Sequence, residues 1–209
     1  MNTKKPQLTN ARADFKSVRP KHNRIKAMIY EKNTIEFVQV AMEFCRLIET
    51  TSEDSLSSFA DKAVKILPLL YLKATLLPQY CEPDEDSEPE QFITETTYEA
   101  IRTHLANLIG EYDAYLETFH PDMQYSDTPI ATTISENLAD VYQDIGDFAA
   151  LFRQGNELTM VKALYVCEEN FRLYWGRKLL SALKALHPVR FCDDLSINEN
   201  YNVEDTDDL

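Results

Sequence analysis

The sequence predicts an all-α fold: a helical bundle of about five main helices, mainly antiparallel, with flexible termini. Glycine is scarce, because only four occur in 209 residues, whereas average usage of about 7% would give roughly fifteen. Apolar residues recur at intervals of three and four over several long segments, which is the period of an amphipathic helix. Capping residues and prolines separate these segments. Turn-rich β architectures are therefore not expected.

The charge is unevenly distributed along the chain. The formal net charge is -14, yet residues 1–27 carry eight Lys and Arg and one acid, so residues 28–209 hold 13 basic and 34 acidic residues. An acidic body of this kind repels nucleic acid and anionic membranes. We expect a protein partner and no membrane association.

Residues 1–27 form a basic leader without a sustained apolar period, which indicates a flexible arm. One interpretation is a tail that binds nucleic acid or a partner, and any nucleic-acid binding is expected only through this segment. The favoured interpretation is an upstream extension before a second start at Met28, where the helical pattern begins.

The cysteines and the apolar runs indicate a compartment. The four cysteines contain no C-x-x-C pair, and the sequence has no signal peptide and no apolar run of about 18 residues. We therefore expect a reduced, cytoplasmic protein.

Two helices are predicted first in the bundle domain, which spans residues 28–188. The first covers about 34–50, with Asn33 as N-cap and Glu36 at the third helical position. The second covers about 55–79, and Pro68 inside it predicts a kink or a split near that point.

An acidic loop at 82–90 precedes the next two helices. The third helix is predicted over about 95–119. After a long connection, Thr133 and Glu136 form a capping box that opens the fourth helix. That helix ends at Gly155, a residue suited to the position after a helix C-terminus.

The fifth helix is predicted over about 158–187 and stops at Pro188. Residues 189–209 are acidic and aperiodic, which indicates a mobile tail. A first apolar stripe of this helix includes Trp175, the chain's one tryptophan, which we assign to the core. A second stripe contains Val166, Leu173 and Leu180, so the helix is expected to be central in the bundle.

Gly176 follows the tryptophan and is expected where a neighbouring helix backbone approaches closely. Arg177 lies at the edge of the second stripe, and Asp140 and Asp144 flank the apolar seam of the fourth helix. The favoured interpretation is an Arg–Asp link between helices. The alternative is a polar pocket for an anionic ligand, formed by Asp140, Tyr142, Asp144 and Arg177.

Three segments carry a resemblance to a known family: "SENLADVYQDI", "FRLYWGRKLLSALKALH" and "ILPLLYLKA". They resemble the helical family catalogued as domain of unknown function 5063, over most of residues 33–187. The resemblance implies a helical fold and no particular activity. Members of that family often carry His after the Trp-Gly-Arg, where this chain has Lys178.

Common catalytic motifs are missing from the sequence. It has no phosphate loop, nucleophile elbow, dinucleotide fingerprint or H-E-x-x-H. Its one E-x-x-H, Glu117 to His120, falls short of the two that a di-iron bundle needs. We predict no catalytic residue, no cofactor and no metal ligand. The favoured function is a cytoplasmic protein-protein interaction or scaffolding module, and the alternative is a ligand- or metal-binding enzyme that uses the Asp/Arg/Tyr pocket.

Overall fold

The computed structural model describes residues 26–51, 55–80, 90–117 and 130–192. Most of the predicted basic leader, acidic loop and acidic tail therefore lie outside the described residues. The helices are α2 (Lys32–Glu49), α3 (Leu56–Thr75), α4 (Glu95–Ile109), α5 (Ile134–Arg153), α6 (Glu157–Asn170) and α7 (Gly176–Arg190). A 3-10 turn (Gly110–Tyr112), a π-helical turn (Phe171–Trp175) and the strands β1 (Ala114–Glu117) and β2 (Ile130–Thr133) complete the order.

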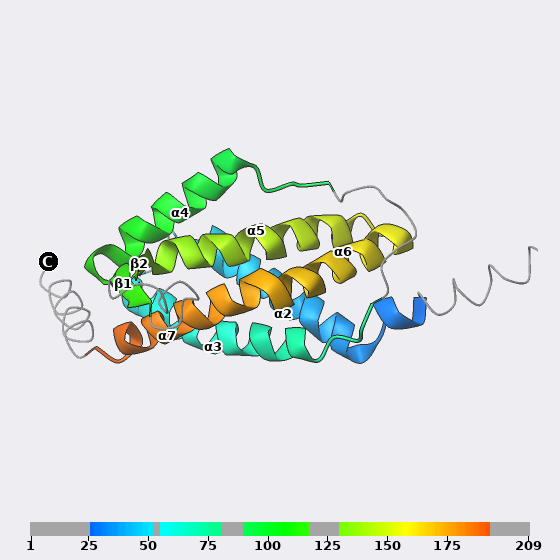
Figure 1. The fold of residues 1–209 in the computed structure, drawn as a ribbon, viewed down its shortest axis with the longest axis horizontal. Helices are drawn as coiled ribbons and strands as arrows, with labels where there is room; N and C mark the ends of the chain where they lie inside the picture. Colours follow the sequence, from blue (N-terminus) through cyan, green and yellow to red (C-terminus); the bar gives the residue numbers. More distant parts are fainter. Residues whose placement is uncertain (1–25, 52–54, 81–89, 118–129, 193–209) are drawn as a thin grey trace, which may run out of the picture.

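Four helical rods form the bundle: α2, α3, α5, and the rod of α6, the π turn and α7. α3 packs against α2 and α7, and α5 packs against α2, α6 and α7. Figure 1 shows the neighbouring rods running antiparallel, with α4 along the outer side of α5. The predicted all-α bundle is confirmed.

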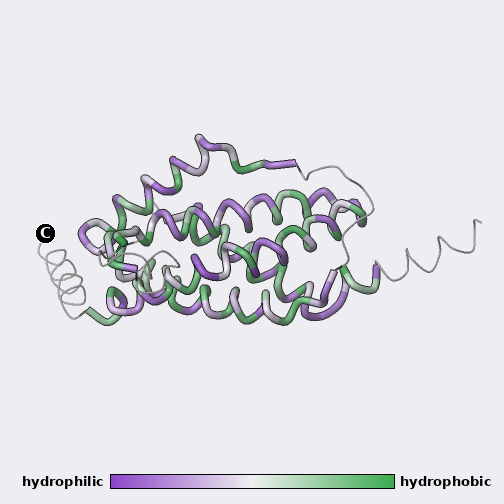
Figure 2. The backbone as a smooth tube through the Cα atoms, in the orientation of Figure 1, coloured by the Kyte–Doolittle hydropathy of each residue, from purple (hydrophilic) through white to green (hydrophobic). Residues whose placement is uncertain are grey.

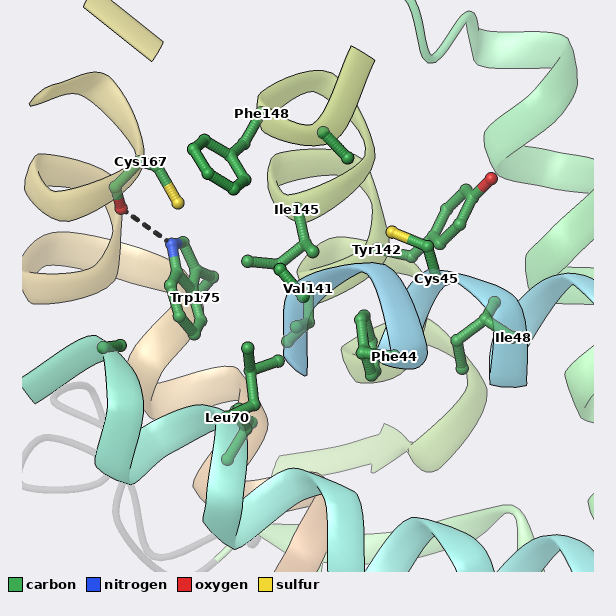
Figure 3. Close-up of a cluster of buried hydrophobic side chains, with 14 of the residues drawn as sticks. Phe44, Cys45, Ile48, Leu70, Val141, Tyr142, Ile145, Phe148, Cys167 and Trp175 are labelled. Atoms are coloured by element: carbon green, nitrogen blue, oxygen red, sulfur yellow. Dashed lines mark hydrogen bonds between the residues drawn. The ribbon is translucent and has the colours of Figure 1, made fainter. Parts of the chain in front are cut away.

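The core lies between the four rods, where each amphipathic helix buries its apolar stripe. Figure 2 shows hydrophobic and hydrophilic stretches alternating along the helices. Large side chains that are fully buried include Trp175, Phe37, Phe44 and Phe59. Part of this core is drawn in Figure 3, in which Trp175, Leu70 of α3, Ile145 of α5 and Phe44 of α2 belong to one buried cluster. None of the helices in the described ranges combines the length and apolar character needed to cross a bilayer.

The start of α2 differs from the prediction. The helix begins at Lys32 and its N-cap, Glu31, makes no side-chain capping hydrogen bond, so Asn33 is not the cap. The Thr34 hydroxyl, which is buried, donates instead to the Met28 carbonyl at 2.9 Å. At α5, by contrast, the Thr133 side chain accepts from the Glu136 N–H, which confirms the predicted cap.

α3 passes through Pro68 without a split. Leu67 and Leu70 on either side of the proline are fully buried, so packing stabilises the helix although one backbone donor is missing. At the end of the fifth predicted helix, Pro188 likewise lies inside α7, which continues to Arg190. The last turn is held by buried Val189 and by Arg190 Nε, which donates to Asp61 Oδ1 at 2.8 Å.

The predicted third helix is too long. α4 ends at Ile109 because Gly110 adopts a φ of 61°, a left-handed conformation that glycine adopts readily. The chain then forms β1, which pairs antiparallel with β2. Leu116, which lies within the predicted helix, is instead an exposed residue of β1.

A π turn interrupts the predicted fifth helix. Residues Phe171–Trp175 have the wider π geometry, and the Gly176 N–H donates to the Phe171 carbonyl five residues back. Trp175 is fully buried, as predicted, and its Nε1 donates to the Cys167 carbonyl at 3.0 Å. Leu173 and Leu180 are exposed, so the expected burial of the second stripe is wrong.

Gly176 is needed for a different reason from the one predicted. A Cβ at this position would lie 2.5 Å from the Phe171 carbonyl oxygen and 2.8 Å from its ring. The close approach therefore comes from the π turn of the same rod and not from the backbone of a neighbouring helix.

Candidate functional site: an acidic cleft beside helix α5

Asp140 on α5 lies in a closed hydrogen-bonded cluster. Its Oδ1 accepts from the Tyr98 hydroxyl at 2.9 Å, and its Oδ2 lies 2.9 Å from the Lys178 ammonium. Tyr174 on the π turn lies near enough to Asp140 for that carboxylate to raise its pKa. Burial, followed by the interaction with Asp140, raises the pKa of both tyrosines, so they remain protonated at neutral pH. Asp140 on α5 thus contacts side chains of α4 and α7.

The Arg–Asp link predicted for this region is wrong. Arg177 is exposed, and its Nη2 donates to the Leu173 carbonyl at 2.6 Å, whereas Lys178 contacts Asp140. A π turn adds about one residue to the helical count. Lys178 therefore occupies the position that Arg177 would have in an uninterrupted α-helix.

The remaining predicted site residues separate in the structure. The Tyr142 hydroxyl donates to Glu49 Oε1 on α2 at 3.0 Å. Asp144 faces α6, where Asn170 Nδ2 donates to its Oδ1 at 2.5 Å. Of the four residues predicted to form a polar pocket, only Asp144 lines a cleft described below.

A cleft of about 320 Å³ lies between α5, α6 and residues 90–91. Its lining combines polar and apolar residues. Among the described residues that line it, three are acidic and none is basic. The lining residues are Glu90, Gln91, Gln143, Asp144, Asp147, Phe148, Leu151, Ala163, Val166, Cys167, Asn170 and Tyr174. We call this space the α5 cleft.

Asp144 is the perturbed acid of the α5 cleft. Burial is the main cause that raises its pKa, to about 6, and the carboxylates of Asp147 and Asp140 act in the same direction. The Asn170 hydrogen bond opposes the rise. Asp144 therefore exchanges a proton close to neutral pH, where an ordinary aspartate is fully ionised.

Asp147 fixes the chain that enters α4. Its Oδ1 accepts from the Phe92 N–H at 2.6 Å and from the Ile93 N–H at 2.7 Å. Gly146 leaves room for Ile93, because a Cβ there would lie 2.9 Å from Ile93 Cδ1. A second hollow, of about 390 Å³, adjoins the α5 cleft at Gln91 and Gln143.

Asp144→Asn is expected to stabilise the protein by about 2 kcal/mol at pH 7 and to change little near pH 3.5. The unfolded aspartate titrates near 3.9, so between about pH 4 and 6 the native state binds more protons than the unfolded state. The free energy of unfolding of the wild type therefore falls as pH rises through this range, and the neutral amide removes that loss. Urea unfolding at several pH values measures the free energy of unfolding of both proteins. A difference between wild type and Asp144→Asn that stays constant with pH would contradict the raised pKa of Asp144.

Several residues of the site were not predicted from the sequence. Asp147 lies seven residues after Asp140, a spacing that places both on the same side of α5, so the sequence contains a signal for it. Tyr98, Asn170 and Tyr174 come from other elements, and their approach depends on how those elements pack. In the described ranges, no group of three or more His, Cys, Asp or Glu is placed to hold a metal ion.

Comparisons with known proteins give a family and a similar structure. The family model described as "Domain of unknown function (DUF5063)" matches residues 28–192. The crystal structure of protein BF1032 from Bacteroides fragilis is 46% identical, with a TM-score of 0.71, and the match covers 79% of this chain and 96% of that one. No curated protein matches this chain.

Proposed function

Because this chain belongs to the family described as "Domain of unknown function (DUF5063)", whose match includes the whole α5 cleft, we propose that this cleft is a binding site of an interaction or scaffolding module. The ligand that it suits is a lysine or arginine side chain of a partner protein. The single observation that carries the proposal is a cleft whose described lining combines three acids and no base with several apolar side chains.

The shape and lining favour a cation on an apolar stem. A volume of about 320 Å³ is at the low end of the roughly 300–1,000 Å³ of small-ligand pockets, so the cleft has room for one long side chain. Phe148, Leu151 and Val166 offer contacts for methylene groups, and the carboxylates of Asp144 and Asp147 line the same cleft and can pair with a charged end. The net charge of -14 attracts basic partners over distance.

The raised pKa of Asp144 indicates that the cleft would bind a cation favourably. A partly buried carboxylate without a cation is disfavoured in its ionised form, and an entering ammonium or guanidinium removes that penalty. Binding would then release the proton from Asp144. With a pKa of about 6, the affinity for a cation is expected to increase about tenfold from pH 5 to pH 7.

A capped pentapeptide, acetyl-Ala-Leu-Lys-Leu-Ala-amide, is the first probe. We expect chemical-shift changes in NMR spectra at Asn170 and Tyr174, with an affinity that increases about tenfold between pH 5 and 7 and decreases with salt. Asp144→Asn is expected to weaken binding at least fivefold at pH 7 and to remove the pH dependence.

Two controls test specificity. A peptide with norleucine in place of lysine keeps the apolar stem and should not bind measurably. Glu43→Gln, an exposed acid on α2, should leave the affinity unchanged. Equal binding of the norleucine peptide, or an affinity unaffected by Asp144→Asn, would exclude the cleft as a site for basic side chains.

An acid–base enzyme that uses Asp144 is the second candidate, since a carboxyl group with a pKa near 6 in a cleft is typical of catalytic sites. Tyr142 and Arg177 have other partners, so the set predicted from the sequence does not support it. Thermal unfolding with nucleotides, small anions and divalent metals tests this candidate. A ligand at a hundred times its dissociation constant adds about 2.7 kcal/mol, or roughly 5–10 °C, and Asp144→Asn should abolish that shift.

We propose the cytoplasm as the compartment. Cys45 and Cys167 are buried free thiols, and burial raises the pKa of Cys45 to about 12 and that of Cys167 above its ordinary value. Both thiols are therefore unreactive core residues, consistent with a reducing environment. The redox state of the cysteines in purified protein, measured by mass after alkylation, tests this point.

A further inference from the structure

Helices α3 and α7 are basic, although the chain as a whole is acidic. α7 contains four basic residues and no acid, and α3 contains three basic residues and one acid, Asp61. The net charge of the whole chain is -14. The positive charge of the described residues is therefore concentrated on two helices.

The same two helices expose leucines. Leu69 and Leu72 on α3 and Leu76 at its C-cap are 42%, 51% and 43% exposed, and Leu180 on α7 is 43% exposed. The three α3 leucines follow the spacing of one helix face. Contiguous exposed apolar surface on a soluble protein marks an interaction site.

The two exposed stripes lie side by side. α3 and α7 pack against each other, and Figure 1 shows them as neighbours. Asp61 and Arg190 pair at one end of their seam, and the Tyr71 and Phe171 rings meet at the other, with centroids 5.2 Å apart. We call the combined outer surface the α3/α7 face. It is defined by Lys65, Leu69, Leu72, Leu76, Arg177 and Leu180.

Arg177 on this face is exposed and donates to the Leu173 carbonyl. Asp61 forms ion pairs with both Lys65 and Arg190. Lys73 and Lys178 form ion pairs with acids outside this face, Glu36 and Asp140 respectively. An occupant of the α3/α7 face should therefore combine acidic residues with apolar ones.

We propose that residues 193–209 of the same chain bind the α3/α7 face. This segment, DDLSINENYNVEDTDDL, contains seven acids and no base, with Leu195, Ile197, Tyr201, Val203 and Leu209 between them. Its composition is thus complementary to the basic residues and leucines of the face. The segment covers the leucines and competes with any acidic partner for the same surface.

The attachment point and the length permit this contact. Residue 193 follows Cys192, two residues after the end of α7. Seventeen residues span up to about 56 Å when extended, whereas the 20 residues of α3 extend over about 30 Å. The covalent link gives the segment an effective concentration of about 1 mM at the face, so a weak intrinsic affinity is sufficient.

A fluorescent peptide of residues 193–209 added to the full-length chain tests the proposal by anisotropy. The recipient is a full-length variant whose seven tail acids are changed to Asn or Gln, which leaves the α3/α7 face open. We expect the peptide to bind this variant about tenfold more tightly than the wild type, because the wild-type tail competes in cis. Binding should weaken with salt.

Face and control variants locate the contact. These variants are made in the chain whose seven tail acids are neutralised, which we call the neutral-tail chain. We expect peptide binding to weaken at least fivefold with the double substitution Leu72→Gln and Leu180→Gln, and likewise with Arg177→Gln alone. Leu158→Gln removes a leucine that is 59% exposed on α6 and should have no effect. Circular dichroism confirms that each variant is folded.

Three results would overturn the proposal. The first is no difference in peptide affinity between the neutral-tail and wild-type chains. The second is equal binding of a scrambled peptide of the same composition, which would indicate nonspecific charge attraction. The third is a decrease in oligomer mass on Leu72→Gln with Leu180→Gln at unchanged peptide affinity, which would make the face an interface between two copies.

Discussion

Trp175→Ala is expected to lower the free energy of unfolding by about 4 kcal/mol, the typical cost of removing a large buried aromatic side chain. The indole is fully buried, its ring centroid lies 4.7 Å from that of Phe171, and its Nε1 donates to the Cys167 carbonyl. For a domain of this size the melting temperature should fall by roughly 8–16 °C. Circular dichroism in urea gives the free energy without relying on tryptophan fluorescence, which this variant lacks.

Matched variants separate volume from hydrogen bonding at this position. Trp175→Phe keeps an aromatic ring and should lose about half as much stability, because the Cys167 carbonyl still accepts from the Phe171 N–H. Leu173→Ala changes a side chain that is 66% exposed and should alter stability by less than about 0.5 kcal/mol. A loss below about 2 kcal/mol for Trp175→Ala would show that the bundle does not depend on this side chain.

Gly176→Ala is expected to lower stability by about 3 kcal/mol, although alanine is favoured over glycine by about 1 kcal/mol inside an ordinary helix. The new Cβ would lie 2.5 Å from the Phe171 carbonyl oxygen, so the π turn must shift to accept it, and overpacking of this kind costs roughly 1–3 kcal/mol or more. Thermal and urea unfolding give both the sign and the size of the change.

Two further variants identify the source of the clash. Phe171→Leu removes the ring but keeps the carbonyl, so Gly176→Ala should still destabilise that background. Gly146→Ala meets the flexible end of Ile93 and should cost only about 1 kcal/mol. A stabilising Gly176→Ala would mean that the π turn relaxes to an α-helix at no cost.

Much of the fold could be predicted from the sequence because the responsible interactions are local. The apolar period located α2, α3 and α5 to within a few residues of their ends. The Thr133 cap of α5 was predicted correctly, and Gly155 has the positive φ, 73°, of a residue that ends a helix. In each case a few neighbouring residues determine the backbone conformation.

The candidate site was predictable only in part. Asp140 and Asp144 stand out in the sequence as a pair flanking an apolar seam. Their partners could not be assigned, because Tyr98, Asn170 and Lys178 are 42, 26 and 38 positions away from the acids that they contact.

The amphipathic helices, their mainly antiparallel order and the burial of Trp175 follow from the amino-acid sequence, because side-chain periodicity and capping act within a few residues. Three other features depend on how the chain packs: the end of α4 at Gly110, the π turn and the α5 cleft. The π turn shifts the helix by one residue, so that Lys178 and not Arg177 contacts Asp140. No local sequence pattern predicts this shift. The π turn persists because packing of Trp175 and Phe171 against the core stabilises a backbone geometry that is unfavourable in an isolated helix.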